Sequence, residues 1–169
     1  PGALLDLAPL YNSRLDESNS DPNHAFQEMP VGVNRFDGIE FDVRGIIRLS
    51  KEEHSKFPAT SGLLSVNRHC ARLHFLHASE STVRQTDIGE YVVHYEDGTE
   101  LRIPLQRGLN IDDRYKFPSK GAPAHPRPPA PLIVGWQGEN AFTRVNATSH
   151  LWVFRHAWDN PKPAVRIKS

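Results

Sequence analysis

Residues 91–103 read YVVHYEDGTELRI, with apolar and polar residues alternating on both sides of Asp97 and Gly98. Alternation at a period of two is typical of a β-strand with one buried face. An Asp-Gly pair favours a tight turn, in which both residues must tolerate positive φ. The stretch therefore predicts a β-hairpin, and it points to the fold class because similar signals recur along the chain.

A second hairpin is expected around Asp37 and Gly38, which separate VNRF at residues 33–36 from IEFDV at residues 39–43. Alternate residues of the second segment are apolar and would share one face of a strand. Short apolar runs bounded by turn residues predict further strands at residues 45–49, 132–136, 151–158 and 164–168.

Residues 63–77 fit two kinds of structure, because their apolar side chains also match one face of a helix. The alternation of Leu73 and Phe75 with polar neighbours favours a strand over residues 71–77. The sequence SKEE at residues 50–53 has the spacing of a capping box, which predicts a single helical turn.

The composition also favours an all-β domain. The 169 residues include 14 prolines and 11 glycines, which leave few windows for a helix of about 11 residues, the usual mean. One domain over residues 1–169 is expected, excised from a larger protein or processed, because the chain begins with Pro1. The proline-rich residues 118–131 predict an extended surface loop.

The charge balance and the short apolar runs argue against two classes of partner. Twenty basic residues balance 20 acidic ones, so the basic surface typical of nucleic-acid binders is not expected. No apolar run approaches the ~18 residues that span a bilayer, so membrane insertion is not expected either. A single cysteine, Cys70, cannot form an internal disulfide.

The segment Asp112-Asp113-Arg114-Tyr115 places an aromatic ring among charged groups at the start of the proline-rich stretch. Carboxylates and a guanidinium group can orient hydroxyls while a ring supplies apolar contact area, so these four residues are candidates for carbohydrate binding. The alternative is an ordinary loop anchored by its charges.

Trp152 is the fifth candidate for carbohydrate binding. Alternate residues between 150 and 158 carry rings, which would gather on one face of a strand: His150, Trp152, Phe154, His156 and Trp158. An exposed tryptophan could stack against a sugar. The alternative interpretation is that these rings fill the space between two sheets.

Metal ligands cannot be assigned from the sequence. Oxygen-bearing side chains near the N-terminus make a structural calcium ion a candidate cofactor: Asp6, Asp16, Glu17, Asp21 and Asn23. They lack the spacing of an EF-hand. His69, His74 and His77 are close in sequence, but His74 and His77 would point to opposite faces of a strand.

No catalytic residues are predicted. The chain contains no nucleophile elbow, phosphate-binding loop or dinucleotide fingerprint, and Cys70 has no identifiable base. Glu40 and Asp42 lie two residues apart on one strand, whereas glycosidase acid–base pairs normally come from different elements around a cleft. The sequence therefore favours a non-enzymatic domain.

Several stretches together resemble a bacterial β-sandwich module that occurs within larger extracytoplasmic or regulatory proteins and is similar to galactose-binding-like carbohydrate-binding modules. They are LDLAPLYN at residues 5–12, FDGIEFDVRG at 36–45, RLHFLHA at 72–78, GEYVVHYEDG at 89–98 and WDNP at 158–161. The resemblance implies a jelly-roll-type β-sandwich with two antiparallel sheets and little helix.

The predicted function is non-catalytic carbohydrate recognition that targets a larger, extracytoplasmic or secreted protein to a glycan. A protein-interaction or structural accessory domain, bound to other domains of a parent protein, is the first alternative. A glycoside hydrolase is the second.

Overall fold

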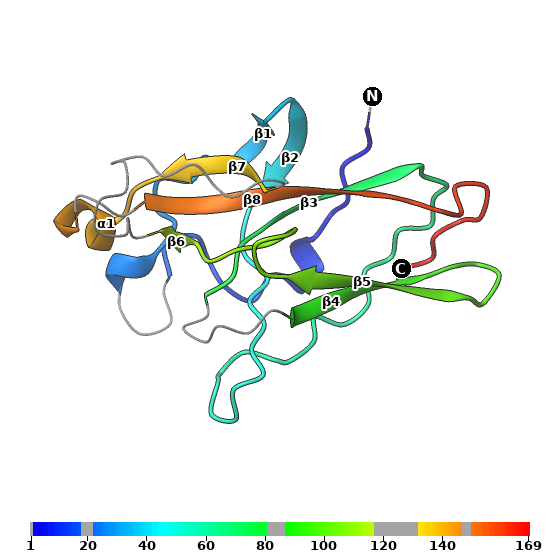
Figure 1. Cartoon of the computed structure of the whole chain (residues 1–169), viewed down its shortest axis with the longest axis horizontal. Helices are drawn as coiled ribbons and strands as arrows, with labels where there is room; N and C mark the ends of the chain where they lie inside the picture. Colours follow the sequence, from blue (N-terminus) through cyan, green and yellow to red (C-terminus); the bar gives the residue numbers. More distant parts are fainter. Residues whose placement is uncertain (1, 18–21, 81–86, 117–131, 147–149) are drawn as a thin grey trace.

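The computed structural model describes residues 2–17, 22–80, 87–116, 132–146 and 150–169. Within them lie β1 (Gly32–Phe36), β2 (Ile39–Val43), β3 (Arg72–His77), β4 (Asp87–His94), β5 (Glu100–Gln106), β6 (Tyr115–Lys116), β7 (Ile133–Gly138) and β8 (His150–Asp159). The helical elements are η1 (Ala8–Leu10), η2 (Pro22–His24) and α1 (Ala141–Val145). The described residues are thus rich in β-strand and poor in helix, as predicted (Figure 1).

Strand β8 is the centre of a four-stranded antiparallel sheet. Leu151 of β8 pairs with Tyr115 of β6 at one edge and with Gly138 of β7 at the other. Phe154 of β8 pairs with His77 of β3 and with Val134 of β7. Strands β3 and β6 therefore share one edge of β8, and β7 occupies the opposite edge.

The two predicted hairpins are confirmed, although their turns differ. Strands β1 and β2 meet at Asp37 and Gly38, whose φ angles of 47° and 80° fit a two-residue turn. In the β4–β5 hairpin, the Tyr95 N–H donates to the Thr99 carbonyl at 2.9 Å, and Gly98 has φ 82°. The loop there has one residue more than a tight turn, and Asp97 does not adopt positive φ.

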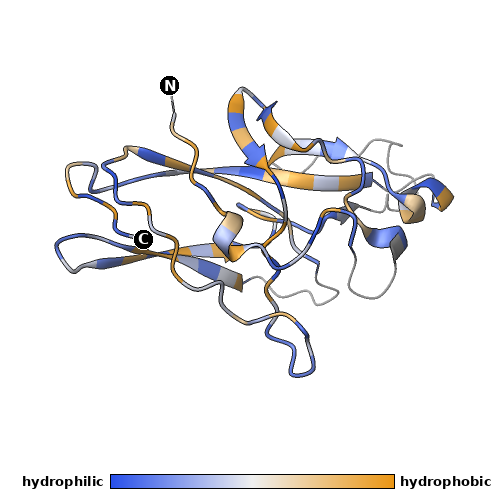
Figure 2. Ribbon diagram, turned by 180° about the vertical axis from the view of Figure 1, so that it is seen from behind, coloured by the Kyte–Doolittle hydropathy of each residue, from blue (hydrophilic) through white to orange (hydrophobic). Residues whose placement is uncertain are grey.

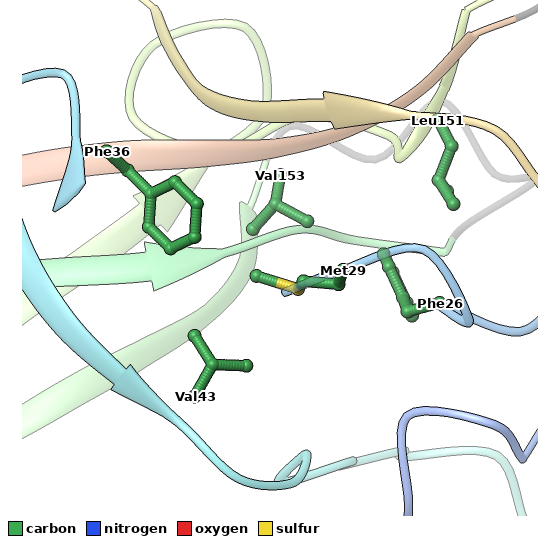
Figure 3. Close-up of a cluster of buried hydrophobic side chains, with 6 residues drawn as sticks. All are labelled: Phe26, Met29, Phe36, Val43, Leu151 and Val153. Carbon is green, nitrogen blue, oxygen red and sulfur yellow. The ribbon is translucent and has the colours of Figure 1, made fainter. Parts of the chain in front are cut away.

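The central sheet is covered on both faces. Side chains alternate along β8, so Leu151 and Val153 lie in one core cluster with Phe36 and Val43 of the β1–β2 hairpin, and Leu151 lies next to Phe26 (Figure 3). Figure 2 shows the matching alternation of hydrophobic and hydrophilic residues along that hairpin. The other face, including Trp158 of β8, packs against the β4–β5 hairpin. This arrangement explains why six of the ten residues of β8 are apolar, with apolar side chains on both faces of the strand.

Two predicted strands do not form. Residues 45–49 make only an isolated bridge, between Ile46 and Ser13, and residues 164–168 make only isolated bridges through Ile167. Ile167 is nevertheless fully buried. These segments are apolar because they contribute to the core. An apolar run indicates burial, but it does not show whether the segment pairs with a neighbour as a strand.

The predicted helical turn at residues 50–53 is also wrong. The Ser50 hydroxyl accepts a hydrogen bond from the Glu52 N–H at 3.2 Å, two residues on instead of three, and the chain forms a simple turn. The strand over residues 71–77 and those at residues 132–136 and 151–158 are confirmed as β3, β7 and β8. The proline-rich residues 118–131 lie outside the described residues.

Candidate functional site

The predicted segment from Asp112 to Tyr115 comes together in the structure, but it is not an exposed loop. Asp112 and Arg114 are each only 3% exposed. The Ser79 N–H donates to the Asp112 carbonyl and the Arg114 N–H donates to the Ser79 carbonyl, both at 2.9 Å. The Trp152 N–H donates to the Arg114 carbonyl at 2.8 Å, so the segment is built into the sheet.

The charged groups of this segment pair with Arg107 and Glu80, which lie outside the segment, and Glu80 is itself 48% exposed. The guanidinium group of Arg107 contacts Asp112 at 3.2 Å and Asp113 at 3.1 Å. Arg114 contacts the carboxylate of Glu80 at 2.5 Å and donates to the His24 carbonyl at 3.0 Å. We call these five charged residues, Arg107, Asp112, Asp113, Arg114 and Glu80, the buried charge cluster. The ion pair with Glu80 and the hydrogen bond to His24 join residues 107–114 to two segments that are distant in sequence.

Tyr115 is likewise not the exposed ring that the sequence suggested. Its hydroxyl accepts a hydrogen bond from Asn140 at 2.8 Å, and its ring makes edge contacts with His24 and Phe142. Burial raises the pKa of this phenol above its ordinary value. Tyr115 therefore serves as an anchor between β6 and the start of α1.

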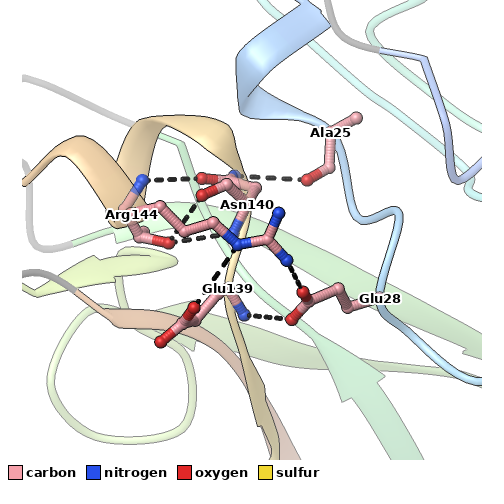
Figure 4. A network of polar contacts seen from close by, with 6 residues as sticks. Ala25, Glu28, Glu139, Asn140 and Arg144 are labelled. Carbon is pink, nitrogen blue, oxygen red and sulfur yellow. Dashed lines mark hydrogen bonds and ion pairs between the residues drawn. The ribbon is translucent and has the colours of Figure 1, made fainter.

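Asn140 provides the other half of that anchor. Its side-chain oxygen caps α1 by accepting from the Thr143 N–H at 3.0 Å, and its amide also donates to the Ala25 carbonyl (Figure 4). An ion pair between Arg144 and Glu28 closes the same network at its exposed side. These contacts fix the corner of the molecule next to Tyr115.

Trp152 is 3% exposed, so the prediction that it offers a stacking platform is wrong. Its ring packs with Phe154 and Leu132. The indole N–H has no hydrogen-bond partner among the described residues. The alternative interpretation, in which the rings of β8 belong to the core, holds for Trp152 because the face that carries it is covered.

A row of parallel rings continues along the same face of the sheet. Phe75 stacks on Tyr91 with centroids 4.1 Å apart, and His77 and His156 lie beside them. The Nε2 of His77 lies 2.8 Å from the Asn110 carbonyl and must donate to it, so Nδ1 accepts from the Tyr91 hydroxyl at 2.8 Å. Burial lowers the pKa of His77 to about 4 and raises that of Tyr91. The imidazole is therefore neutral and structural.

A different part of the structure offers an open site. A depression of about 390 Å³ is lined by residues of the N-terminal segment and of the chain following β2: Tyr11, Asn12, Ser13, Arg14, Glu17, Arg44 and Gly45. We call it the Tyr11 depression. Burial raises the pKa of the Tyr11 phenol, with a smaller contribution from the nearby Asp42 carboxylate.

Two local features build this depression. The side chain of Asn12 accepts from the Arg48 N–H at 2.8 Å and donates to the Arg48 carbonyl at 2.9 Å, which joins the segments as a strand pair would. Gly45 lies against the Tyr11 ring, and a Cβ at this position would come within 2.9 Å of the ring. Glycine is therefore required where the ring rests on the backbone.

Two ion pairs border the Tyr11 depression through the arginines that line it, and their aspartates differ in exposure, at 54% for Asp16 and 19% for Asp42. Arg14 makes a two-pronged contact with Asp16, both bonds at 2.8 Å, and Arg44 contacts Asp42 at 2.6 Å. Glu17 lines the depression and accepts from the Arg14 N–H at 3.1 Å. The depression thus combines one aromatic ring with donors and acceptors of both charges.

Sequence reasoning missed the Tyr11 depression, although it had singled out Asp16 and Glu17 as possible calcium ligands. The depression forms only because residues 11–17 pair with residues 44–48, through contacts such as the bridge between Ser13 and Ile46. No periodic pattern in either segment signals that pairing.

Among the residues that the structure describes, no group of three or more His, Cys, Asp or Glu side chains could hold a metal ion. Asp21, one of the candidate calcium ligands, lies outside them. No helix in the described ranges is long and apolar enough to span a membrane.

Comparison of the chain with protein-family models, curated proteins and solved structures gives no match. The resemblance to galactose-binding-like modules therefore stays a prediction.

Proposed function

We propose that this domain binds a carbohydrate without catalysis, that the Tyr11 depression is the binding site, and that binding brings a larger, extracytoplasmic protein to a glycan. The observation that carries the proposal is an open depression lined by one aromatic ring and by Arg14 and Arg44, each of which pairs with an aspartate. For the finer architecture we propose a jelly-roll-type sandwich, which is supported by a four-stranded antiparallel sheet with a hairpin on each face.

The chemistry of a sugar matches this surface. A sugar ring has apolar C–H groups that pack against an aromatic side chain, and its hydroxyls each donate and accept hydrogen bonds. The pairs Arg14–Asp16 and Arg44–Asp42 present donors and acceptors side by side, and Glu17 adds a further acceptor. An open depression of about 390 Å³ can accommodate one or two sugar units.

The absence of catalysis is part of the proposal. Glu17 is the one carboxylate among the residues that line the described depression, whereas glycoside hydrolysis normally needs two carboxyl groups across a cleft. Glu40 and Asp42 do not fill this role, because each pairs with its own arginine, Arg35 and Arg44 respectively.

A protein-interaction domain is the second candidate function. Val31 and Val33 are 71% and 60% exposed at the start of the β1–β2 hairpin. Two neighbouring exposed valines are the apolar feature that favours a protein partner, although they form a small surface.

Glycan-array screening of the domain, followed by calorimetric titration of the glycans that bind, tests the proposal. Arg44→Ala should weaken binding about tenfold, since it removes a charged donor from the site. Arg35→Ala is the matched control, because Arg35 is also exposed and paired with a carboxylate of β2 but does not line the depression. The proposal fails if the domain binds no glycan, or if the two variants bind equally well.

A further inference from the structure

The Tyr11 depression is surrounded by more negative than positive charge. Among the described residues, Glu17, Arg14 and Arg44 line the depression. Asp6, Asp16, Asp42 and Arg48 interact electrostatically with residues that line it, which makes four carboxylates and three guanidinium groups in all. The excess of one carboxylate would repel an anionic ligand.

Each of these guanidinium groups already has a partner. Arg14 and Arg44 are both held in two-pronged contacts by their aspartates. Arg48 donates to the Glu17 carbonyl at 2.6 Å. Aspartate occupies the Nε edge of Arg14 and of Arg44, and the Nε of Arg48 is buried without a partner among the described residues. A ligand carboxylate could reach only the remaining N–H groups of Arg14 and Arg44, each next to an aspartate that repels it.

The contacts with aspartate still leave N–H groups for a neutral ligand. A two-pronged contact occupies two of the roughly five N–H groups of an arginine, and the others can donate to hydroxyl oxygens. A sugar hydroxyl can at the same time donate to Glu17 or to a remaining lone pair of an aspartate oxygen. A ligand carboxylate could not, because an ionised carboxylate only accepts.

We propose, on the basis of the carbohydrate-binding function proposed above, that the Tyr11 depression selects uncharged sugars and discriminates against sugars that carry a carboxylate. Asp42 and Asp16 are then specificity-determining residues, because they occupy the two arginines that would otherwise attract an acidic sugar.

Affinity measurements with matched oligosaccharides test this selectivity. The probes are oligomers of galactose and galacturonic acid, and of mannose and mannuronic acid, which differ within each pair only at carbon 6. At low salt, at least one neutral oligomer should bind, and its acidic counterpart should bind at least about threefold more weakly. The difference should shrink as salt is added, because these charges are exposed.

Asp42→Asn releases Arg44 and removes one negative charge, so it should increase the affinity for the acidic oligomer about threefold or more. Asp16→Asn should act in the same way through Arg14, and it provides a second, more exposed variant if Asp42→Asn melts early. Glu40→Gln is the control, because Glu40 pairs with Arg35 away from the depression.

The outcomes separate the two proposals. Acidic oligomers that bind the wild type as tightly as neutral ones would overturn the selectivity and leave carbohydrate binding intact. If folded Asp42→Asn and Asp16→Asn proteins gain no affinity for acidic oligomers, the two aspartates are not the source of selectivity. Failure of all four oligomers and of every glycan on the array to bind would overturn carbohydrate binding itself, and preferential binding of acidic glycans on the array would overturn the selectivity.

Discussion

The buried charge cluster and the Tyr11 depression are built from the same kinds of residue but differ in exposure. Each contains arginine–carboxylate pairs next to a tyrosine ring. The side chain of Arg114 is 3% exposed, whereas that of Arg14 is 74% exposed. In the cluster, the charges bind other parts of the chain, and in the depression their outer faces remain open to solvent. Because of this difference in burial, the Tyr11 depression can contact a ligand and the buried charge cluster cannot.

The largest expected effect comes from breaking the buried charge cluster. Arg114→Ala should lower the free energy of unfolding by roughly 3–5 kcal/mol, because it leaves a cavity beside the Phe26 and Tyr115 rings and removes the donor of the His24 carbonyl. The ion pair with Glu80 contributes little, since Glu80 is 48% exposed. Urea denaturation measures this loss. Arg14→Ala is the matched control and should leave the denaturation midpoint unchanged, since exposed pairs contribute little. Equal stability of the two variants would contradict the distinction between the regions.

Acidification should destabilise the protein through His77, a buried residue that lies in neither of the two regions. Its pKa in the folded protein is about 4, below the ~6.5 of an unfolded chain, so the unfolded state takes up the proton first. The stability that neutral His77 provides is complete above pH ~6.5 and is lost as the pH falls towards 4, by roughly 3 kcal/mol in all.

Urea denaturation between pH 7 and 4 measures this dependence. Because Gln does not titrate, His77→Gln should be less stable than the wild type at pH 7 but should lose less stability on acidification. A variant with the same pH dependence as the wild type would show that other groups, such as His74 and His156, whose pKa values burial also lowers, cause the loss.

The sequence predicted the elements whose determinants are local. The turns at Asp37-Gly38 and Asp97-Gly98 follow from residues that tolerate tight reversals, and β8 follows from its apolar run. The burial of Asp112 and Arg114 could not be predicted, because their partners include Ser79, Glu80 and His24, which are distant in sequence. The sequence of a charged segment does not distinguish side chains that are exposed to solvent from side chains that form ion pairs within the protein.

A smaller effect is expected where the two regions are most alike, at their tyrosines. Tyr115→Phe should lower the free energy of unfolding by about 1 kcal/mol, because it removes the hydrogen bond from Asn140 and keeps the ring. The thermal midpoint of the variant checks this value. A loss above about 3 kcal/mol would mean that the hydroxyl supports more of the corner around α1 than this single bond.

The most direct test of the account is a calorimetric titration of one glycan from the array into Arg14→Ala and Tyr115→Phe. If the glycan binds in the Tyr11 depression, Arg14→Ala should keep its melting temperature and lose about tenfold in affinity, whereas Tyr115→Phe should melt earlier and bind as the wild type does. The reverse result, with unchanged affinity in Arg14→Ala and weakened binding by folded Tyr115→Phe, would place the site at residues 112–115 and contradict the account.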